Sequence, residues 1–270
     1  MANLYPNGAG GSLGDSWATC KPLYASGAVW YVQSTTGTDA ASPAGRNREK
    51  PLATLAQAIT NASANDVIVL LSAHTETRVA VITISKALTI VGEGLSSGVP
   101  TVTFICGYVG NLFSITAGNV ELRNIKIPTS SVVNSSTRIT NNQTDFVMDG
   151  CYVECGANDT AAALTLASGS DRTRIRNSTF ISTATVSSAQ PESAIKTSAA
   201  VADLELDGLV LSAGTVGFSN YFALDASSAA VTRLRGLNVS LLLGADVNLH
   251  ASTTGRLNVQ TVSGGSRVQW

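Results

Sequence analysis

The chain has 270 residues and a formal net charge of −1, and charged residues make up 13% of it. This balance excludes long-range electrostatic attraction to nucleic acid or to an anionic membrane. No apolar run reaches the ~18–20 residues that cross a bilayer. Ala, Ser, Thr, Val and Gly are abundant instead, as is typical of stacked strands and tight turns rather than helices.

Residues 1–28 are rich in glycine and turn formers, and they lack the basic end and the apolar core of a secretory signal. We therefore expect synthesis in a cytoplasm, with exit by another route such as cell lysis. Tyr5, Trp17 and Tyr24 are isolated aromatic residues in a segment without a core of its own. Two interpretations stay open: a disordered tail, or an attachment arm that becomes ordered on a partner.

The next stretch combines strand signals with one helix signal. Apolar runs at 29–32 and 66–71 predict strands, and shorter runs predict two more at 81–84 and 87–92. Apolar residues at 52, 55, 56, 58 and 59 follow Pro51, which suits the first turn of a helix because its missing N–H has no partner there. We expect an amphipathic helix that starts at Pro51 and ends near Asn61.

From residue 112 onward a three-residue marker recurs, in which an apolar and a charged residue precede an Asn or Gly. The Asn/Gly positions 124, 150, 177, 208 and 236 are spaced 26, 27, 31 and 28 residues apart, and a period of this length indicates a solenoid. Each unit contains three short strands in which alternate residues face inward. A sharp bend falls at the Asn or Gly, the residues that enter the left-handed backbone region at least cost. The pattern predicts an all-β parallel β-helix with three short strands per coil.

The charged member of the marker alternates in sign from coil to coil. Because stacked coils lie ~4.8 Å apart, equivalent side chains sit above one another, and opposite charges help by a few tenths to ~1 kcal/mol per pair. We expect an outward charge ladder that fixes register, beside an inward apolar stack of Leu122, Met148, Ile175, Leu206, Leu234 and Leu257. The ladder comprises Arg123, Asp149, Arg176, Asp207 and Arg235, with a second column of Glu121, Val147, Arg174, Glu205, Arg233 and Arg256.

The segment that precedes the repeat has a recognisable order of motifs. It reads Val-Trp-Tyr-Val (29–32), Thr-Gly-Thr-Asp (36–39), Lys-Pro-Leu-Ala-Thr-Leu-Ala-Gln-Ala-Ile (50–59), Asn-Asp-Val-Ile-Val-Leu (65–70), His-Thr-Glu-Thr (74–77) and Ile-Ser-Lys-Ala-Leu-Thr-Ile-Val-Gly-Glu-Gly (84–94). This order resembles the N-terminal cap of pectin-lyase-like β-helix proteins, although His74 stands where that superfamily usually has an aromatic residue beside a glycine. The resemblance covers residues 29–262 and implies a right-handed, single-stranded parallel β-helix with a short N-terminal capping helix. The expected organisation is an arm at 1–28, a cap with the first coils at 29–95 and the β-helix body at 96–270.

An enzymatic function has one candidate site. Asp203, Glu205 and Asp207 lie on one strand face, with separations that suit glycoside hydrolysis by paired carboxylates. The ladder, however, places arginines beside Glu205 and Asp207. Opposite charges nearby favour the ionised form, whereas a general acid must hold its proton. Asp145 and Asp149 are the next candidates, and Asp149 is bracketed in the same way. We therefore predict no catalytic residue and no cofactor.

The cysteines and histidines do not suggest a metal site. Cys151 and Cys155 form a C-x3-C pair, and His74 and His250 are the only histidines. A zinc site needs more ligands than this arrangement offers. Cys151 occupies a slot that Ile125 and other apolar residues hold in neighbouring repeats, so we expect a core thiol there.

The expected function follows from the resemblance together with the missing signal, the neutralised acidic face and the arm ahead of a rigid rod. These features are similar to those of bacteriophage β-helix proteins and imply a non-enzymatic virion structural protein, a capsid decoration or cement protein on the particle surface. Its partners would be other virion proteins, reached through the arm, and copies of itself in a homo-oligomer such as a trimer. One alternative is a tail-spike or tail-fibre-like receptor-binding protein, and the other is a polysaccharide-cleaving enzyme or sugar-binding module.

Overall fold

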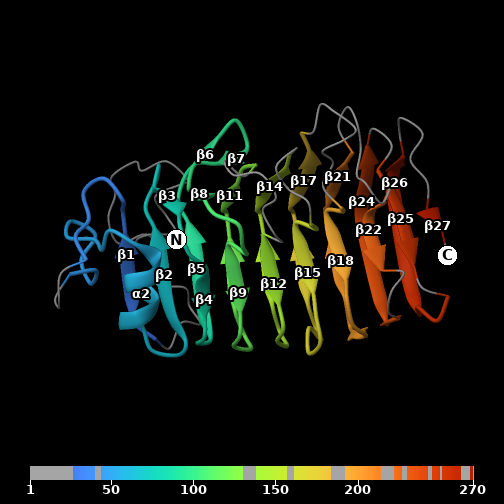
Figure 1. Ribbon diagram of the computed structural model, residues 1–270, viewed down its shortest axis with the longest axis horizontal. Helices are drawn as coiled ribbons and strands as arrows, with labels where there is room; N and C mark the ends of the chain where they lie inside the picture. Colours follow the sequence, from blue (N-terminus) through green and yellow to red (C-terminus); the bar gives the residue numbers. More distant parts are fainter. Residues whose placement is uncertain are drawn as a thin grey trace, which may run out of the picture.

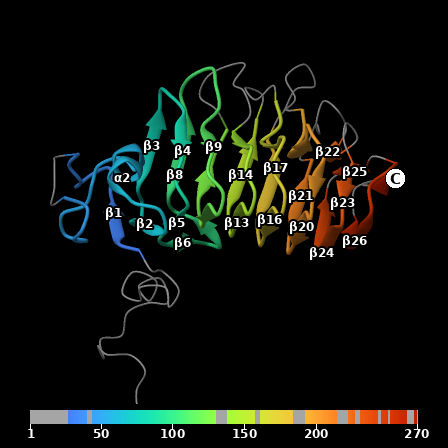
Figure 2. The same cartoon turned by 90° about the horizontal axis from the view of Figure 1, so that it is seen from below.

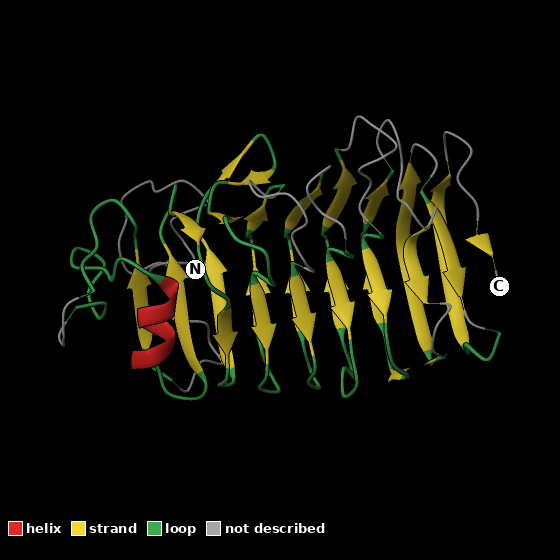
Figure 3. Cartoon of the chain, viewed as in Figure 1, coloured by secondary structure: helices red, strands yellow, loops and turns green. Residues whose placement is uncertain are grey.

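The chain forms an elongated parallel β-helix that runs from its N-terminal to its C-terminal end along the long axis (Figure 1). The computed structural model describes residues 27–39, 44–129, 138–156, 161–183, 192–213, 222–226, 230–242, 245–249, 251–262 and 268–269. Strands dominate this part of the chain, and one short helix lies at the N-terminal end (Figure 3). The predicted all-β parallel β-helix with a short helix is thus confirmed.

Three faces of stacked strands enclose the core, as the three-strand coil predicts. Face 1 consists of β1 (Val29–Val32), β2 (Asp66–Leu70), β5 (Leu88–Gly92), β10 (Glu121–Arg123), β13 (Val147–Asp149), β16 (Arg174–Arg176), β20 (Glu205–Asp207), β24 (Leu234–Leu242) and β26 (Gly255–Val262). Face 2 consists of β3 (Thr75–Arg78), β8 (Thr103–Cys106), β11 (Lys126–Ile127), β14 (Tyr152–Cys155), β17 (Thr179–Ser182) and β21 (Val210–Ser212). Face 3 consists of β4 (Ile82–Ile84), β9 (Phe113–Ile115), β12 (Ile139–Asn141), β15 (Leu164–Leu166), β18 (Ile195–Thr197), β22 (Phe222–Ala226), β25 (Asp246–Leu249) and β27 (Val268–Gln269).

Neighbouring strands within each face pair in parallel, as expected when each coil lies directly on the previous one. The long strand β24 pairs with β20 through its first half and with β21 through its second half, so it joins faces 1 and 2 into one sheet. Two small two-stranded sheets lie outside the three faces. One is the antiparallel pair of β6 (Leu95–Ser96) and β7 (Val99–Pro100), and the other is the parallel pair of β19 (Val201–Ala202) and β23 (Val231–Thr232).

Inward side chains from all three faces fill a continuous apolar core. Its largest members include Phe104, Phe113, Phe146 and Phe180, all fully buried. Phe104 and Phe113 meet edge to face, with ring centroids 5.3 Å apart. Burial of such side chains contributes roughly 1.5–3 kcal/mol each, so the stack of coils rather than any single coil holds the fold together.

Helix α2 (Leu55–Asn61) lies at the N-terminal end of the β-helix and buries Leu55, Ala58 and Ile59. It begins four residues after Pro51, where the sequence predicted its start, because the Thr54 side chain accepts a hydrogen bond from Gln57 N and caps the first turn. Leu52, which follows Pro51, is extended instead and forms a parallel bridge with Val32. The predicted end near Asn61 is confirmed.

Asp66, the first residue of β2, holds the chain where it enters face 1. Its carboxylate accepts hydrogen bonds from Ala28 N at 2.6 Å, from Trp30 Nε1 at 2.9 Å and from Ser63 N at 2.8 Å. Burial by itself would raise the pKa of Asp66, but these three donors, with Arg46 nearby, lower it below the ordinary value. The ionised form is therefore the one that the fold stabilises.

Asp66→Asn should lower the free energy of unfolding by about 1–3 kcal/mol at pH 7, because charge-assisted hydrogen bonds are lost. Since the pKa of Asp66 is lowered in the folded state, its contribution is present above the unfolded pKa of about 4 and disappears as the pH falls through the folded value. The difference in melting temperature between the wild type and the variant should therefore shrink between pH 6 and pH 3. A difference that stays constant would contradict this assignment.

The described cysteines are all core thiols. Cys106, Cys151 and Cys155 are buried, and burial raises the pKa of Cys151 to about 12. We expect iodoacetamide at pH 8 to leave these three unlabelled in the native protein and to label them once urea unfolds the chain, because the thiolate is the reactive form. Mass spectrometry of peptides reports each site, and labelling of Cys151 under native conditions would contradict the structure.

The register of the coils departs from the prediction at one place. Glu205 pairs with Arg235, Leu206 with Gly236 and Asp207 with Leu237, so β24 is shifted by two residues from the predicted alignment. Gly236 takes the inward position that the sequence assigned to Leu234. A Cβ on Gly236 would lie 2.2 Å from Leu257 Cδ1, so the side chain of the next coil uses the space that this glycine leaves.

Candidate functional site

A column of residues with positive φ forms the bend between faces 1 and 2. The column alternates strictly between two residue types, as Asn124, Gly150, Asn177, Gly208 and Asn238. The last member is Asn238 rather than the predicted Gly236, because of the register shift. Each glycine leaves room for the preceding asparagine: a Cβ on Gly150 would lie 2.4 Å from Asn124 Oδ1, and one on Gly208 would lie 2.8 Å from Asn177 Oδ1.

The predicted charge ladder is present on the outer side of face 1 for four of its five members. Arg123, Asp149, Arg176 and Asp207 pair in register on successive strands. Arg235 is the exception, and its prediction was wrong: it lies opposite Glu205, whereas Leu237 lies opposite Asp207. The predicted neighbour of Glu205, Arg233, is therefore displaced as well.

Contacts between these side chains differ from a simple vertical ladder. Among the described residues no ion pair joins consecutive members of the column, and Arg176 instead contacts Glu205 at 2.6 Å. Arg174 lies 3.8 Å from the other oxygen of Glu205. Asp149 and Asp207 accept hydrogen bonds from bend asparagines, with distances of 2.9 Å to Asn177 Nδ2 and 3.0 Å to Asn238 Nδ2.

A second alternating column, which the sequence analysis missed, lies at the turn that leads into face 1. Asp145, Arg172, Asp203 and Arg233 all have positive φ, between 55° and 62°. Arg172 binds Asp145 through two contacts, of 2.7 Å from Nε and 2.6 Å from Nη2, and Arg233 pairs with Asp203. The Arg172 side chain holds the pKa of Asp145 below its ordinary value.

Asp203, Glu205 and Asp207 form the acidic trio that an enzymatic function would use, and each of them has a polar partner. Asp203 pairs with Arg233, Glu205 with Arg176, and Asp207 accepts from Asn238. Each carboxylate is therefore in contact with a cation or an amide donor. A glycosidase needs one carboxyl group that keeps its proton until the leaving group departs. What this arrangement offers is a paired, register-fixing surface.

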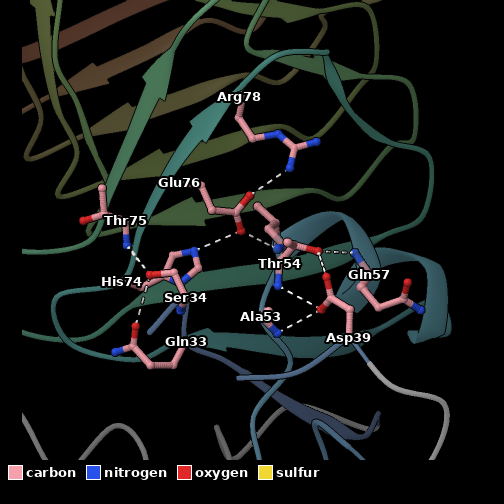
Figure 4. A network of polar contacts seen from close by, with 11 residues as sticks. Gln33, Ser34, Asp39, Ala53, Thr54, Gln57, His74, Thr75, Glu76 and Arg78 are labelled. Atoms are coloured by element: carbon pink, nitrogen blue, oxygen red, sulfur yellow. Dashed lines mark hydrogen bonds and ion pairs between the residues drawn. The ribbon is translucent and has the colours of Figure 1, made fainter. Parts of the chain in front are cut away.

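A buried polar network around His74 and Glu76 lies in the first coil (Figure 4). His74 is fully buried; its Nδ1 accepts from Ser34 N at 3.0 Å, so the ring proton lies on Nε2, which donates to Glu76 Oε1 at 3.0 Å. The same oxygen accepts from Leu55 N, the first N–H of α2, at 2.5 Å. Arg78 donates to the other carboxylate oxygen at 3.1 Å.

This Ser–His–Glu cluster is structural rather than nucleophilic. Ser34 presents its backbone N–H to the imidazole, whereas its hydroxyl oxygen accepts from Thr75 N at 3.1 Å. The His74 nitrogen that would act as a base is thus occupied, and the ring is out of contact with solvent. The network joins three segments instead: the loop after β1, the start of α2 and strand β3.

Three further features of the sequence concern a metal site, a membrane span and the N-terminal arm. Among the described residues no group of three or more His, Cys, Asp or Glu side chains could hold a metal ion. Within the same ranges no helix is long and apolar enough to cross a membrane. The arm residues Tyr5, Trp17 and Tyr24, together with His250, lie outside the described residues.

Comparisons with known proteins place the chain in no family. No protein family, no curated protein and no solved structure matches it. The interpretation of its function therefore rests on its own residues.

Proposed function

We propose that the chain is a non-enzymatic structural protein of a bacteriophage virion, a capsid decoration or cement protein whose β-helix is a rigid rod on the particle surface. One observation supports this most strongly: the carboxylates on the regular outer face form ion pairs with arginines or hydrogen bonds with asparagines. These contacts join neighbouring coils and are well suited to keep many coils in fixed register.

The N-terminal end of the rod is consistent with this proposal. Helix α2 packs against β1 and β2 at that end (Figure 2). Gly27, the first described residue, precedes β1 in the chain. Residues 1–28 would then form the arm that attaches the rod to other virion proteins, with Tyr5, Trp17 and Tyr24 as contact residues. Aromatic side chains are favourable anchors in such interfaces because they bury large areas at low entropic cost.

Particle binding tests the proposal. The full-length protein should co-sediment with purified capsids of the phage whose genome encodes it, and the double variant Trp17→Ala, Tyr24→Ala should bind at least tenfold more weakly. Failure of the wild-type chain to bind any virion component would count heavily against the proposal. Binding to isolated tails but not to capsids would instead favour the receptor-binding alternative.

A polysaccharide assay addresses the enzymatic alternative. We expect no cleavage of acidic or neutral polysaccharides by the wild type, and only a small drop in melting temperature, of about 1–4 °C, for Glu205→Gln and Asp207→Asn, since surface pairs contribute little. Cleavage by the wild type that either substitution abolishes would overturn the structural role of these carboxylates.

A further inference from the structure

The charges on the outer side of face 1 are arranged in bands as well as in columns. On the coils of β13, β16, β20 and β24, the turn column and the two strand columns together place charges of one sign on each coil and of the opposite sign on the next. In order along the rod, the banded face comprises Asp145 and Asp149, then Arg172, Arg174 and Arg176, then Asp203, Glu205 and Asp207, then Arg233 and Arg235.

These bands are accessible to a partner. The side chains of Arg172, Arg174 and Arg176 are 51%, 49% and 40% exposed, and that of Arg233 is 64% exposed. Figure 2 shows β13, β16, β20 and β24 in succession along one side of the rod. The outer side of these strands is therefore an open and regular surface.

The order of the bands makes the face complementary to itself in one orientation. From β13 to β24 the bands are negative, positive, negative and positive. From β24 back to β13 they are positive, negative, positive and negative. A two-fold axis that lies in the plane of the face, parallel to the strands and between β16 and β20, reverses the order of coils in a second copy. Each band then faces a band of opposite sign, whereas two rods packed side by side in parallel would place each band against its equal.

We propose that the banded face is an interface between two copies of this chain, packed antiparallel about that axis. At its centre Arg174 of one copy faces Glu205 of the other. Farther out, Glu121 faces Arg256, which follows Arg235 on the adjacent strand β26. No like-charge pair arises among the described charges: the opposed pairs are Arg172 with Asp203, Arg174 with Glu205, Arg176 with Asp207, Asp145 with Arg233, and Glu121 with Arg256.

The size of the face sets the strength of this association. Strands β10 to β26 span about 24 Å at ~4.8 Å per coil, and the charged width of some five residues adds about 16 Å. The buried area is then on the order of 400 Å² per copy, about half of the ~800 Å² per partner of a standard interface. We therefore expect a weak, reversible and salt-sensitive dimer. This inference does not depend on the proposed virion function, and it replaces the trimer that the resemblance suggested with a two-fold pair.

Sedimentation equilibrium of the full-length chain tests the proposal. In 20 mM NaCl the average mass should rise with concentration from 27.7 kDa toward twice that value. In 500 mM NaCl the dimer dissociation constant should increase at least tenfold, because salt screens exposed charges. A mass of one chain at every concentration in low salt, or a trimer, would overturn the proposal.

A charge-reversal pair identifies the face. Arg174→Glu places two repulsive pairs beside the two-fold axis and should abolish association in low salt, as should Glu205→Arg. A mixture of the two variants should associate again, because each copy then faces an opposite charge at both central positions. Lys50→Glu is the matched control, because it makes the same charge change at an exposed residue beside β1, four strands before β13 in the order of face 1, and should leave the dimer unchanged.

Circular dichroism must show native spectra for each variant, since Glu205 also contacts Arg176 within its own chain. If Glu205→Arg fails to fold, the central pair is tested by Arg174→Glu mixed with Glu205→Gln, where partial recovery is expected. Association of Arg174→Glu as strong as that of the wild type would show that copies meet through another surface, and it would overturn the proposal.

Discussion

Replacing Glu76 with alanine should lower the free energy of unfolding by about 3–5 kcal/mol, the range found when one partner of a buried charged pair is removed. The carboxylate of Glu76 accepts from His74 Nε2, Leu55 N and Arg78 Nη1, and its side chain is only 6% exposed. Alanine would leave a buried imidazole N–H and the first N–H of α2 without an acceptor. The midpoint of urea unfolding, followed by circular dichroism, measures the effect.

Glu76→Gln is the control for this prediction. The amide oxygen can still accept from Leu55 N and His74, so only the charge and the contact with Arg78 are lost, and the destabilisation should be less than half that of Glu76→Ala. Thr77→Ala, at an exposed position on the same strand, should change stability by less than about 0.5 kcal/mol. Equal destabilisation by the alanine and glutamine variants would mean that the hydrogen bonds to Glu76 do not carry the effect.

Gly150→Ala should cost about 2–4 kcal/mol. Gly150 has φ of 63°, where any residue with a Cβ is strained by roughly 1–2 kcal/mol. The added Cβ would also lie 2.4 Å from Asn124 Oδ1 in the neighbouring coil, so that side chain would have to move. The melting temperature and the urea midpoint should both fall.

Two further variants separate backbone strain from the steric effect. Gly98 also has positive φ, at 82°, but nothing lies within 4 Å of a Cβ built there, so Gly98→Ala should show the strain alone, about 1 kcal/mol. Asn124→Gly removes the clashing side chain, and the double variant with Gly150→Ala should be more stable than Gly150→Ala by itself. If Gly98→Ala and Gly150→Ala were equally destabilised, the alternation of Asn and Gly would have no steric cause.

The architecture could be predicted from sequence because the repeat is long enough to be read through variable loops. Each coil carries its own bend residue, and the two-residue period of the strands places the apolar side chains inward independently of loop length. Strands such as β10, β13, β16 and β20 therefore lie where the pattern put them. Their common register follows from the same spacing, because one misplaced residue would turn the apolar side outward.

The register of β24 could not be predicted for a local reason. The string Leu234-Arg235-Gly236 imitates the marker of earlier coils, and only Asn238 has the positive φ of the bend. Choosing between Gly236 and Asn238 requires knowing that Leu257 packs against Gly236 from the next coil. Contacts across coils are not visible in the pattern of one coil.

The polar sites differ in how far sequence could reveal them. Asp145, Arg172, Asp203 and Arg233 each lie five residues before a bend residue, so a search at that offset with Asn238 as the last bend would have found their alternating charges. The His74 network has no comparable signal. Its members come from the loop after β1, from α2 and from β3, and they meet only because helix and first coil pack together.

The alternation of bend residues and charges also sets the smallest number of coils that an insertion or deletion can add or remove without disturbing either pattern. Both patterns repeat every two coils, so the true structural unit is a pair of coils rather than one. Removing the coil that contains β16 would bring the negative band of β13 against the negative band of β20 and would place Gly150 beside Gly208. Removing the coils of β16 and β20 together would instead bring Asp145 beside Arg233 and Gly150 beside Asn238, with both patterns intact. Length changes by duplication or deletion are therefore compatible with this chain only in even numbers of coils.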